Sequence, residues 1–311
     1  MNKAERLIRW APHIHSEETT SKIMVSVIIS LLPGVFGSIY FFGSYAGKII
    51  VVSILSCVIS ELLSQAIFKR KIRIFDGSAI VTGILFAFVL PPKIPLWMVA
   101  LGGFMAIFLV KELFGGIGFN IFNPALASRA ILLASFPSDM TKFYPPFYYK
   151  IDAVSCATPL AIVKEKLSIE LPSYWQLFIG QRAGCIGETS VLLLLIGAIF
   201  LLWRRVISWH IPISYILTVA FLSFIFKQNV LFHILAGGLI LGAFFMATDY
   251  VTSPLTGKGK IIFGVGCGII TFLIRMKGGY PEGVCYSILF MNMFTPIIDR
   301  YTIPRKFGSK R

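Results

Sequence analysis

Long apolar stretches recur along this chain, and they constrain its fold more than any other feature. An apolar run of about 18 residues or more is typical of a helix that crosses a bilayer. Hydrophobic residues make up 56% of the chain and charged residues only 14%, a balance that soluble domains do not have. The sequence therefore predicts an all-α, polytopic membrane protein.

Charge and cysteine usage narrow the function classes. Lys and Arg number 29 against 14 Asp and Glu, an excess that we interpret as an orientation signal facing anionic lipid rather than as a nucleic-acid surface. The polar start of the chain has no cleavable apolar region, so we expect no secretory signal peptide. The 5 cysteines lack C-x-x-C spacing, and no metal site is predicted.

Hydropathy predicts about ten membrane segments. They run approximately over residues 23–42, 46–68, 78–90, 95–110, 121–136, 190–203, 211–226, 231–247, 261–274 and 283–298. The third segment would be about 20 Å long at about 1.5 Å per residue, short of a bilayer core of about 30 Å. A short segment of this kind is expected where broken helices form a site.

Basic residues orient these segments. With both termini in the cytoplasm, the basic runs at 69–73, 204–205 and 258–260 and the basic tail all lie inside. The long polar loop at 137–188 then faces the extracytoplasmic side. Arg275 and Lys277 are exceptions, because this arrangement puts them outside.

Short sequence matches suggest an internal repeat. Glu18-Thr19-Thr20-Ser21 resembles Glu188-Thr189-Ser190, and Gly115-Gly116 resembles Gly278-Gly279, in the same order along the chain. Two halves of five segments must have opposite orientations, which is an inverted five-plus-five repeat with functional sites between the halves. The predicted organisation is a cytoplasmic N-terminal segment (1–22), a first five-helix repeat (23–136), the extracytoplasmic loop (137–188), a second repeat (189–298) and a basic cytoplasmic tail (299–311).

The loop contains a predicted helix start at Thr158. Pro159 suits the first helical position, and Thr158 before it is a good N-cap for a helix reaching Leu167. Unpaired amides at such a helix start favour a negative group, so a phosphate on Thr158 would be stabilised. Taken alone, a Thr-Pro pair favours a cap and nothing more.

Charged residues inside the predicted membrane segments are candidates for ion coupling. Glu61 lies in the second segment and Asp249 ends the eighth. Lys111 and Glu112, which close the fourth segment, are predicted to form an interfacial pair with each other. The same broken-helix repeat is also compatible with a channel or transporter for a small solute, which has no need of a modified loop.

The loop sequence 152–160, D-A-V-S-C-A-T-P-L, resembles the D-x-x-[ST]-G-A-T flavinylation motif of the RnfD family, the D subunits of Rnf ion-translocating oxidoreductase complexes. The B subunits of sodium-translocating NADH:quinone reductases share this motif. The similarity covers nearly the whole chain and includes the stretches 75–79, 122–125, 246–254 and 292–300. The chain departs from the pattern at Cys156, where the family has Gly. Its short N-terminal region favours the RnfD family, and the quinone reductase family is the alternative.

The resemblance implies a membrane flavoprotein that is not catalytic alone. FMN would be attached through a phosphoester to Thr158 by a separate flavin transferase, with Asp152, Ser155 and Ala157 completing the attachment motif. A non-covalent riboflavin between the helices is also implied. The complex would couple electron transfer between ferredoxin and NAD to Na⁺ or H⁺ translocation across the prokaryotic cell (inner) membrane. The implied partners are the other Rnf subunits: membrane subunits, a second FMN subunit and iron–sulfur subunits.

Overall fold

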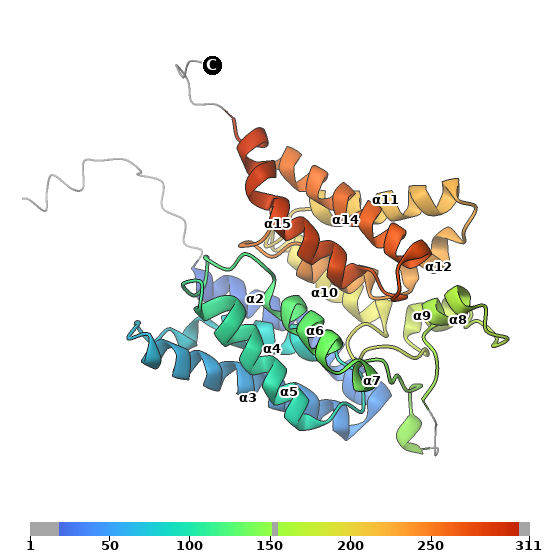
Figure 1. Cartoon of the computed structure of the whole chain (residues 1–311), viewed down its shortest axis with the longest axis horizontal. Helices are drawn as coiled ribbons and strands as arrows, with labels where there is room; N and C mark the ends of the chain where they lie inside the picture. Colours follow the sequence, from blue (N-terminus) through green and yellow to red (C-terminus); the bar gives the residue numbers. More distant parts are fainter. Residues whose placement is uncertain (1–18, 151–154, 305–311) are drawn as a thin grey trace, which may run out of the picture.

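The computed structural model describes residues 19–150 and 155–304. Asp152 lies outside the described residues, as do most of the predicted N-terminal segment and most of the basic tail. Every regular element in the described part of the chain is a helix, which confirms the all-α prediction. Figure 1 shows the helices, with the described ends of the chain toward its upper left.

The five segments predicted in the first half are all helical. Their bounds are α2 (Thr20–Phe42), α3 (Ser44–Ile67), α4 (Ser78–Phe88), α5 (Leu96–Met105), the π-helix η2 (Ala106–Glu112) that continues α5, and α6 (Pro124–Ser135), with the 3-10 helix η1 (Ile74–Asp76) before α4. α2 begins earlier than predicted because the Thr19 hydroxyl accepts a hydrogen bond from the Lys22 amide. Gly43 separates α2 from α3 with a φ of 76°, a conformation that favours glycine.

The second half is helical over the predicted segments, with one internal break. Its elements are α10 (Val191–Trp203), α11 (His210–Ile225), α12 (Val230–Leu235), α13 (Leu239–Leu241), the π-helix η4 (Gly242–Met246), α14 (Gly257–Lys277) and α15 (Val284–Thr302). The eighth segment is interrupted at Gly237 and Gly238, whose φ values are 67° and 66°. A Cβ on Gly238 would collide with Oε2 of Glu188, so the break allows close packing against that residue.

The segment between the halves contains short helices of its own. They are α7 (Pro137–Met140), η3 (Tyr148–Lys150), α8 (Pro159–Glu165) and α9 (Tyr174–Ile179). The Phe147 amide donates to the Phe41 carbonyl at 2.6 Å, and Lys164 Nζ donates to the Tyr280 carbonyl at 2.8 Å. The segment therefore lies against the C-terminal end of α2 and the α14–α15 connection, and Figure 1 shows α8 and α9 far from the described chain ends.

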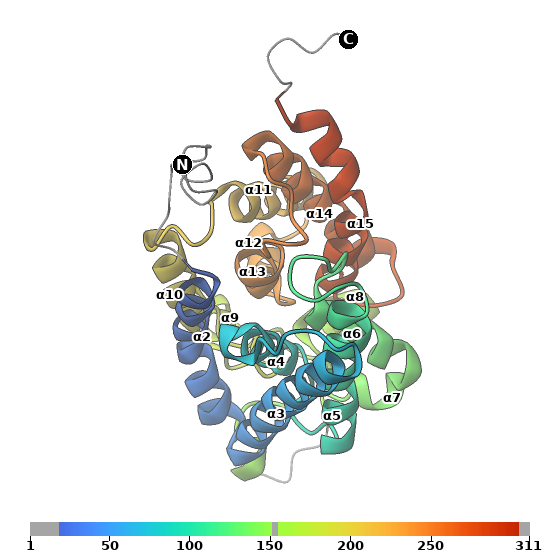
Figure 2. The same ribbon diagram turned by 90° about the vertical axis from the view of Figure 1, so that its left-hand side faces the viewer.

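The two halves pack in similar ways. In the first half, α3 contacts α5 and η2, and η2 contacts α6. In the second half, α11 contacts α14, and α14 contacts α15 in the same order. The first helices of the two halves, α2 and α10, pack against each other, and Figure 2 shows them side by side. A repeat of five helices predicts this correspondence. The inversion of the second half stays a prediction.

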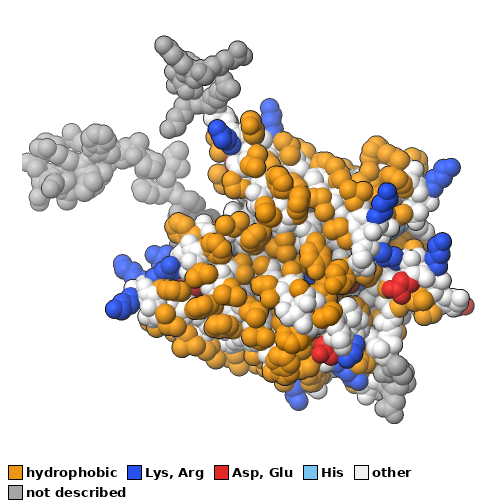
Figure 3. Space-filling view, in the orientation of Figure 1, with side chains coloured by type: hydrophobic (Ala, Val, Ile, Leu, Met, Phe, Trp, Pro, Cys, Tyr) orange, Lys and Arg blue, Asp and Glu red, His pale blue; other side chains and the backbone are white. Residues whose placement is uncertain are grey.

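The surface is that of a membrane protein. α2, α3 and α14 are long and apolar enough to cross a bilayer, and α4, α6, α10 and α11 are apolar but shorter. Phe36 on α2 and Leu217 on α11 are 68% and 61% exposed, which water would penalise and lipid would not. Figure 3 shows hydrophobic side chains over most of one face, with Lys and Arg toward its edges.

Candidate functional site

Thr158 caps α8, as its sequence predicts. Its backbone is extended, with φ −69° and ψ 156°, and its Oγ1 accepts a hydrogen bond of 3.3 Å from the Ala161 amide. Pro159 occupies the first turn. The helix is shorter than predicted and ends in the left-handed conformation of Lys166, so its dipole is small. Charged side chains nearby must therefore supply most of the electrostatics at Thr158.

Thr158 opens onto a pocket of about 480 Å³. The pocket is lined by Ser155, Cys156, Ala157 and Thr158, by Arg129 of α6, by Lys142 after α7, and by Tyr280, Glu282 and Tyr286 around the start of α15. The described residues of the predicted motif thus share one cavity with groups that are distant in sequence. Thr158 is itself 5% exposed, so its hydroxyl lies in the wall of the pocket and not on the outer surface.

A buried ion pair forms part of the wall of this pocket. Arg129 Nη2 lies 2.5 Å from Glu282 Oε2 and 3.6 Å from Cys185 Sγ. Arg129 Nε has no hydrogen-bond partner among the described residues, although it is shielded from solvent. Burying a donor without an acceptor costs free energy, unless another group accepts its hydrogen bond. The arrangement therefore offers a fixed guanidinium with an unused donor beside the cavity.

Cys185, Glu188 and Glu282 form a cluster that resembles a metal-binding group. Their potential ligand atoms lie within 4.8 Å of one another. However, the Arg129 guanidinium contacts Cys185 and Glu282, and the Cys185 amide donates to Glu188 Oε1 at 3.1 Å. A cation already neutralises these acceptors, and the contacts account for the cluster without a metal ion.

Two further arginines stabilise the break in the eighth segment. Arg275 donates to the carbonyls of His233 and Ala236 at 2.6 and 3.0 Å, and Arg182 donates to the Leu235 carbonyl at 2.5 Å. Carbonyls released where a membrane helix is broken need such partners, because lipid offers none. Arg275 is only 4% exposed and binds these carbonyls, which explains why a basic residue lies at the predicted outer end of its segment. Sequence reasoning missed both roles.

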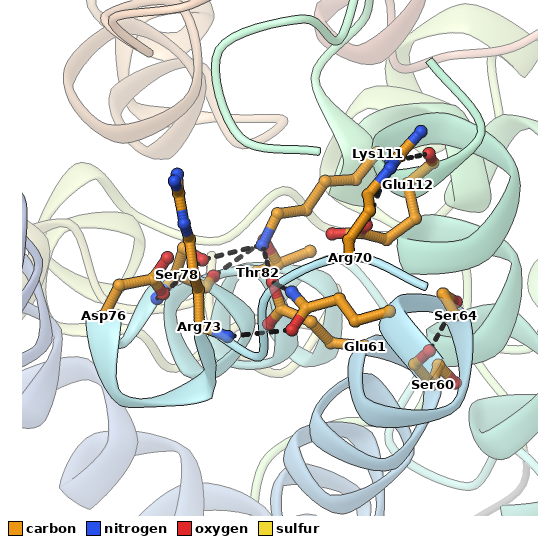
Figure 4. Close-up of polar contacts among 11 residues, drawn as sticks. Ser60, Glu61, Ser64, Arg70, Arg73, Asp76, Ser78, Thr82, Lys111 and Glu112 are labelled. Atoms are coloured by element: carbon orange, nitrogen blue, oxygen red, sulfur yellow. Dashed lines mark hydrogen bonds and ion pairs between the residues drawn. The ribbon is translucent and has the colours of Figure 1, made fainter. Parts of the chain in front are cut away.

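A second polar cluster surrounds Glu61, at the opposite end of α3 from its junction with α2 (Figure 4). Lys111 Nζ lies 2.5 Å from Glu61 Oε1 and 2.7 Å from Ser78 Oγ. Ser78 Oγ donates in turn to Asp76 Oδ1 at 2.6 Å. Gln65 Nε2 also donates to Glu61 Oε1, at 3.3 Å. The cluster joins α3, η1, α4 and η2 through side chains.

The predicted interfacial pair between Lys111 and Glu112 is wrong. Both residues are buried, and consecutive positions on a helix point in different directions. Lys111 reaches Glu61, whereas the Glu112 carboxylate lies 3.4 Å from Arg70 Nη1. Figure 4 shows the two side chains in these separate groups. The cause is tertiary, because α3 packs against η2 and brings Glu61 to Lys111.

Asp249, the other ion-coupling candidate, does not join Glu61 directly. Asp249 follows η4, accepts a hydrogen bond of 3.2 Å from Thr252 Oγ1, and lines a pocket of about 100 Å³ together with Lys111. Glu61 lines a different pocket of about 290 Å³. Lys111 is therefore the residue that binds Glu61 and also faces the cavity of Asp249.

Burial shifts the pKa of two groups on the segment that bears Thr158. It raises the pKa of the Cys156 thiol, so the thiol stays protonated near neutral pH. Burial also lowers the pKa of Lys164, and the nearby Glu165 carboxylate opposes that shift. Cys156 thus stands at the pocket as a small neutral side chain.

Comparison with known proteins gives one consistent result. The family model described as the NQR2, RnfD, RnfE family matches residues 7–308. The D subunit of the Na(+)-translocating ferredoxin:NAD(+) oxidoreductase complex of Acetobacterium woodii is 46% identical over 99% of this chain and 97% of its own length. The proton-translocating counterpart of Clostridium ljungdahlii is also 46% identical, over 98% of this chain and 96% of its own. The D subunit of the ion-translocating oxidoreductase complex of Salmonella newport is 36% identical over 98% and 99% of the two chains.

Proposed function

The chain belongs to the NQR2, RnfD, RnfE family, and from that premise we propose that it is the D subunit of an Rnf-type complex with FMN attached to Thr158. The complex couples electron transfer between ferredoxin and NAD to ion translocation, as the names of its relatives state for those proteins. One observation carries the proposal: the residue that matches the flavinylation motif is the residue that opens onto the 480 Å³ pocket.

The residues around Thr158 fit an FMN group. The pocket volume falls within the range of about 300–1,000 Å³ that small-molecule sites occupy. Arg129 and Lys142 line the pocket together with the carboxylates of Glu165 and Glu282, and the two cations suit a phosphate. The rings of Tyr280 and Tyr286 stack 6.0 Å apart at 21° and offer an aromatic wall.

Bound FMN supplies the exchange of one or two electrons, and the chain's residues hold and tune it. The Thr158 hydroxyl provides the ester oxygen, and Glu282 holds the Arg129 guanidinium in a fixed position. Because Thr158 is nearly buried, the flavin transferase would need access to it before α8 packs onto the helices. Cys156 replaces the glycine of the motif with a side chain small enough for close approach.

The arrangement of the chain supports an extracytoplasmic site and cytoplasmic termini. The segment that bears Thr158 is hydrogen-bonded to the C-terminal ends of α2 and α14, through the Phe147 amide to the Phe41 carbonyl and through Lys164 Nζ to the Ile274 carbonyl. The basic run 69–73 follows the C-terminal end of α3, the next helix after α2. Opposite ends of the molecule then carry the flavin and the basic runs, as the charge rule requires for a prokaryotic cell membrane.

Electron transfer across the membrane would require a second carrier. A bilayer core of about 30 Å separates an outer flavin from the cytoplasmic side. Non-covalent riboflavin, in this subunit or next to it, would fill that role. The pocket beside Asp249 is smaller than the usual small-molecule site, so helix movement would be needed for a flavin to enter it.

The partners follow from the same proposal. They are the other Rnf membrane subunits, a second FMN subunit, iron–sulfur subunits and a flavin transferase. The two relatives that are 46% identical carry names that specify Na⁺ in one case and protons in the other, so the proposal covers either ion. Glu61 and Asp249 are the proposed ion-coupling residues.

In-gel flavin fluorescence of the denatured protein, co-expressed with a flavin transferase, tests the attachment. We expect fluorescence in the wild type, none in Thr158→Val, and retained fluorescence in the matched control Ser155→Ala. Val has nearly the shape of Thr but no hydroxyl to form the ester. Absence of covalent fluorescence in the wild type would contradict the proposal and favour a channel or transporter for a small solute.

A further inference from the structure

Lys111 lies between two pockets, each of which holds one of the ion-coupling carboxylates. Its ammonium binds Glu61 and Ser78, whereas its side chain lines the pocket that also contains Asp249. The side chain of Lys111 is 4% exposed and that of Glu61 is 1% exposed. A charge so deeply buried needs a counter-charge at all times. Two carboxylates near Lys111, those of Glu61 and Asp249, can act as this counter-charge.

Glu61 has capacity to bind a cation. Its Oε2 is buried and has no hydrogen-bond partner among the described residues, and Glu61 lines the 290 Å³ pocket. The same pocket is lined by Gln65 of α3, Asp76 of η1 and Glu112 of η2, which offer oxygen ligands. Hard monovalent or divalent cations bind such oxygens. The basic side chains of Arg70, Lys71 and Arg73 also line the pocket, and Arg70 is engaged by Glu112.

The backbone around Lys111 is irregular in a way that suits movement. Lys111 lies in the π-helix η2, and Asp249 follows the π-helix η4. π-Helical turns are rare and occur frequently at functional sites. Lysine carries a compact charge on a flexible stem, so its ammonium can change partners without a backbone shift.

We propose that Lys111 is a tethered cation that alternates between Glu61 and Asp249 as the transported ion binds and leaves Glu61. This rests on the proposed function. When Na⁺ or a proton from the 290 Å³ pocket neutralises Glu61, the Lys111 ammonium leaves Glu61 and pairs with Asp249. When the ion departs, Lys111 returns. No covalent bond changes apart from the proton on Glu61 in the proton case, and Glu61 always has one cation.

The physical reason for coupling is the cost of an unpaired buried charge. Removing Lys111 from Glu61 without a replacement would leave an uncompensated carboxylate and cost several kcal/mol. The ion and the lysine therefore exclude each other at Glu61. Lys111 can remain separated from Glu61 only while it is paired with Asp249. Ion binding at Glu61 in one pocket is therefore linked to the charge on Asp249 in the other.

Purified complexes in proteoliposomes test the proposal through the number of ions moved per electron transferred. ²²Na⁺ uptake and an internal pH dye are measured in parallel, with ferredoxin and NAD as electron donor and acceptor. Two variants keep the pair neutral or balanced: Glu61→Met/Lys111→Met removes both charges, and Glu61→Lys/Lys111→Glu exchanges them. Asp249→Asn removes the second partner alone, and Lys93→Met is the control, because Lys93 is exposed over the Tyr144 ring.

We expect the ion-to-electron ratio to fall by roughly tenfold or more in all three variants, because each removes the alternation. Lys93→Met should keep the wild-type ratio. A purely structural ion pair predicts the opposite, since the exchanged pair would still hold the helices together. A wild-type ratio in the exchanged variant or in Asp249→Asn would overturn the proposal. If the paired variants fail to assemble, Asp249→Asn decides, because it leaves the Lys111–Glu61 pair intact.

Covalent flavin fluorescence, recorded on the same preparations, separates this proposal from the proposed function. A wild-type complex without covalent flavin contradicts the flavin assignment. A flavin-loaded complex whose ion-to-electron ratio is insensitive to the Lys111 and Asp249 substitutions contradicts the alternation of Lys111 and the ion-coupling roles of Glu61 and Asp249, and it leaves the flavin assignment intact.

Discussion

Within residues 19–150 and 155–304, two buried ion pairs have the same N–O distance of 2.5 Å but different cations. Arg129 pairs with Glu282 beside the Thr158 pocket, and Lys111 pairs with Glu61 near the C-terminal end of α3. The arginine pair is somewhat more open, with side chains 10% and 11% exposed against 4% and 1% for the lysine pair. Their other partners differ as well: Arg129 also contacts Cys185 Sγ, whereas Lys111 also donates to Ser78 Oγ.

The difference follows the chemistry of the two cations. The arginine guanidinium is planar, always charged and directional, so Glu282 and the Cys185 thiol hold it in one orientation. The lysine ammonium is a point charge that three acceptors can share. Under our two proposals, the arginine pair holds the electric field constant at the flavin pocket, and the lysine pair lets a charge move. Substitutions that act on only one member of each pair separate these roles.

The largest expected effect is on stability, from Lys111→Met alone. This variant leaves Glu61 buried without a counter-ion and should cost on the order of 3–5 kcal/mol. Thermal unfolding of the detergent-solubilised complex should show a strongly lowered midpoint. Glu61→Met/Lys111→Met should recover most of the loss. Equal midpoints for the single and double variants would show that the pair is not isolated from solvent as described.

A smaller effect is expected on the flavin potential, from Arg129→Met. Loss of the fixed guanidinium should lower the midpoint potential of the covalent flavin by about 60 mV, a tenfold change for one electron, because the reduced form is more negative. Redox titration of the bound flavin measures it. Glu282→Gln should shift the potential upward, since it removes the opposing charge. Shifts of the same sign in both variants would contradict an electrostatic role for the pair.

Cys156→Gly, which restores the glycine of the motif, should change covalent flavin content by no more than about twofold, since the cysteine is small and neutral. In-gel fluorescence normalised to protein measures it. Cys156→Leu, the matched bulky variant, should lower incorporation much further by crowding the pocket. A large gain in Cys156→Gly would mean that the cysteine itself obstructs attachment.

The smallest effect concerns the reactivity of Cys156. Burial raises the pKa of this thiol, so at pH 8 its thiolate fraction is below that of an ordinary cysteine, and alkylation by iodoacetamide should be slow. The rate should still be increasing at a pH at which an ordinary thiol has already ionised. Peptide mass spectrometry can follow Cys156, with the four buried cysteines as internal references. Rapid alkylation at pH 7 would show a lowered pKa instead.

Local signals in the sequence anticipated much of the structure. Apolar runs located each of the ten segments, and the Thr158-Pro159 pair located the start of α8. These features depend on residues within a few positions of one another. The partners of Lys111 and Arg129 were not anticipated, because Glu61 and Glu282 lie 50 and 153 positions away in the chain. Arg182 and Arg275, which bind the freed carbonyls, lie outside the broken segment, so no local signal connects them to it.

By itself, the sequence determined that this protein is helical, lies in a membrane and presents Thr158 as a helix cap in a stretch that resembles a flavinylation motif. Periodicity, hydropathy and capping are properties of short stretches, and each acts before the chain is folded. The tertiary structure alone decided which charges meet. It paired Arg129 with Glu282 and Lys111 with Glu61, because a buried charge takes its partner from whichever helix packs beside it.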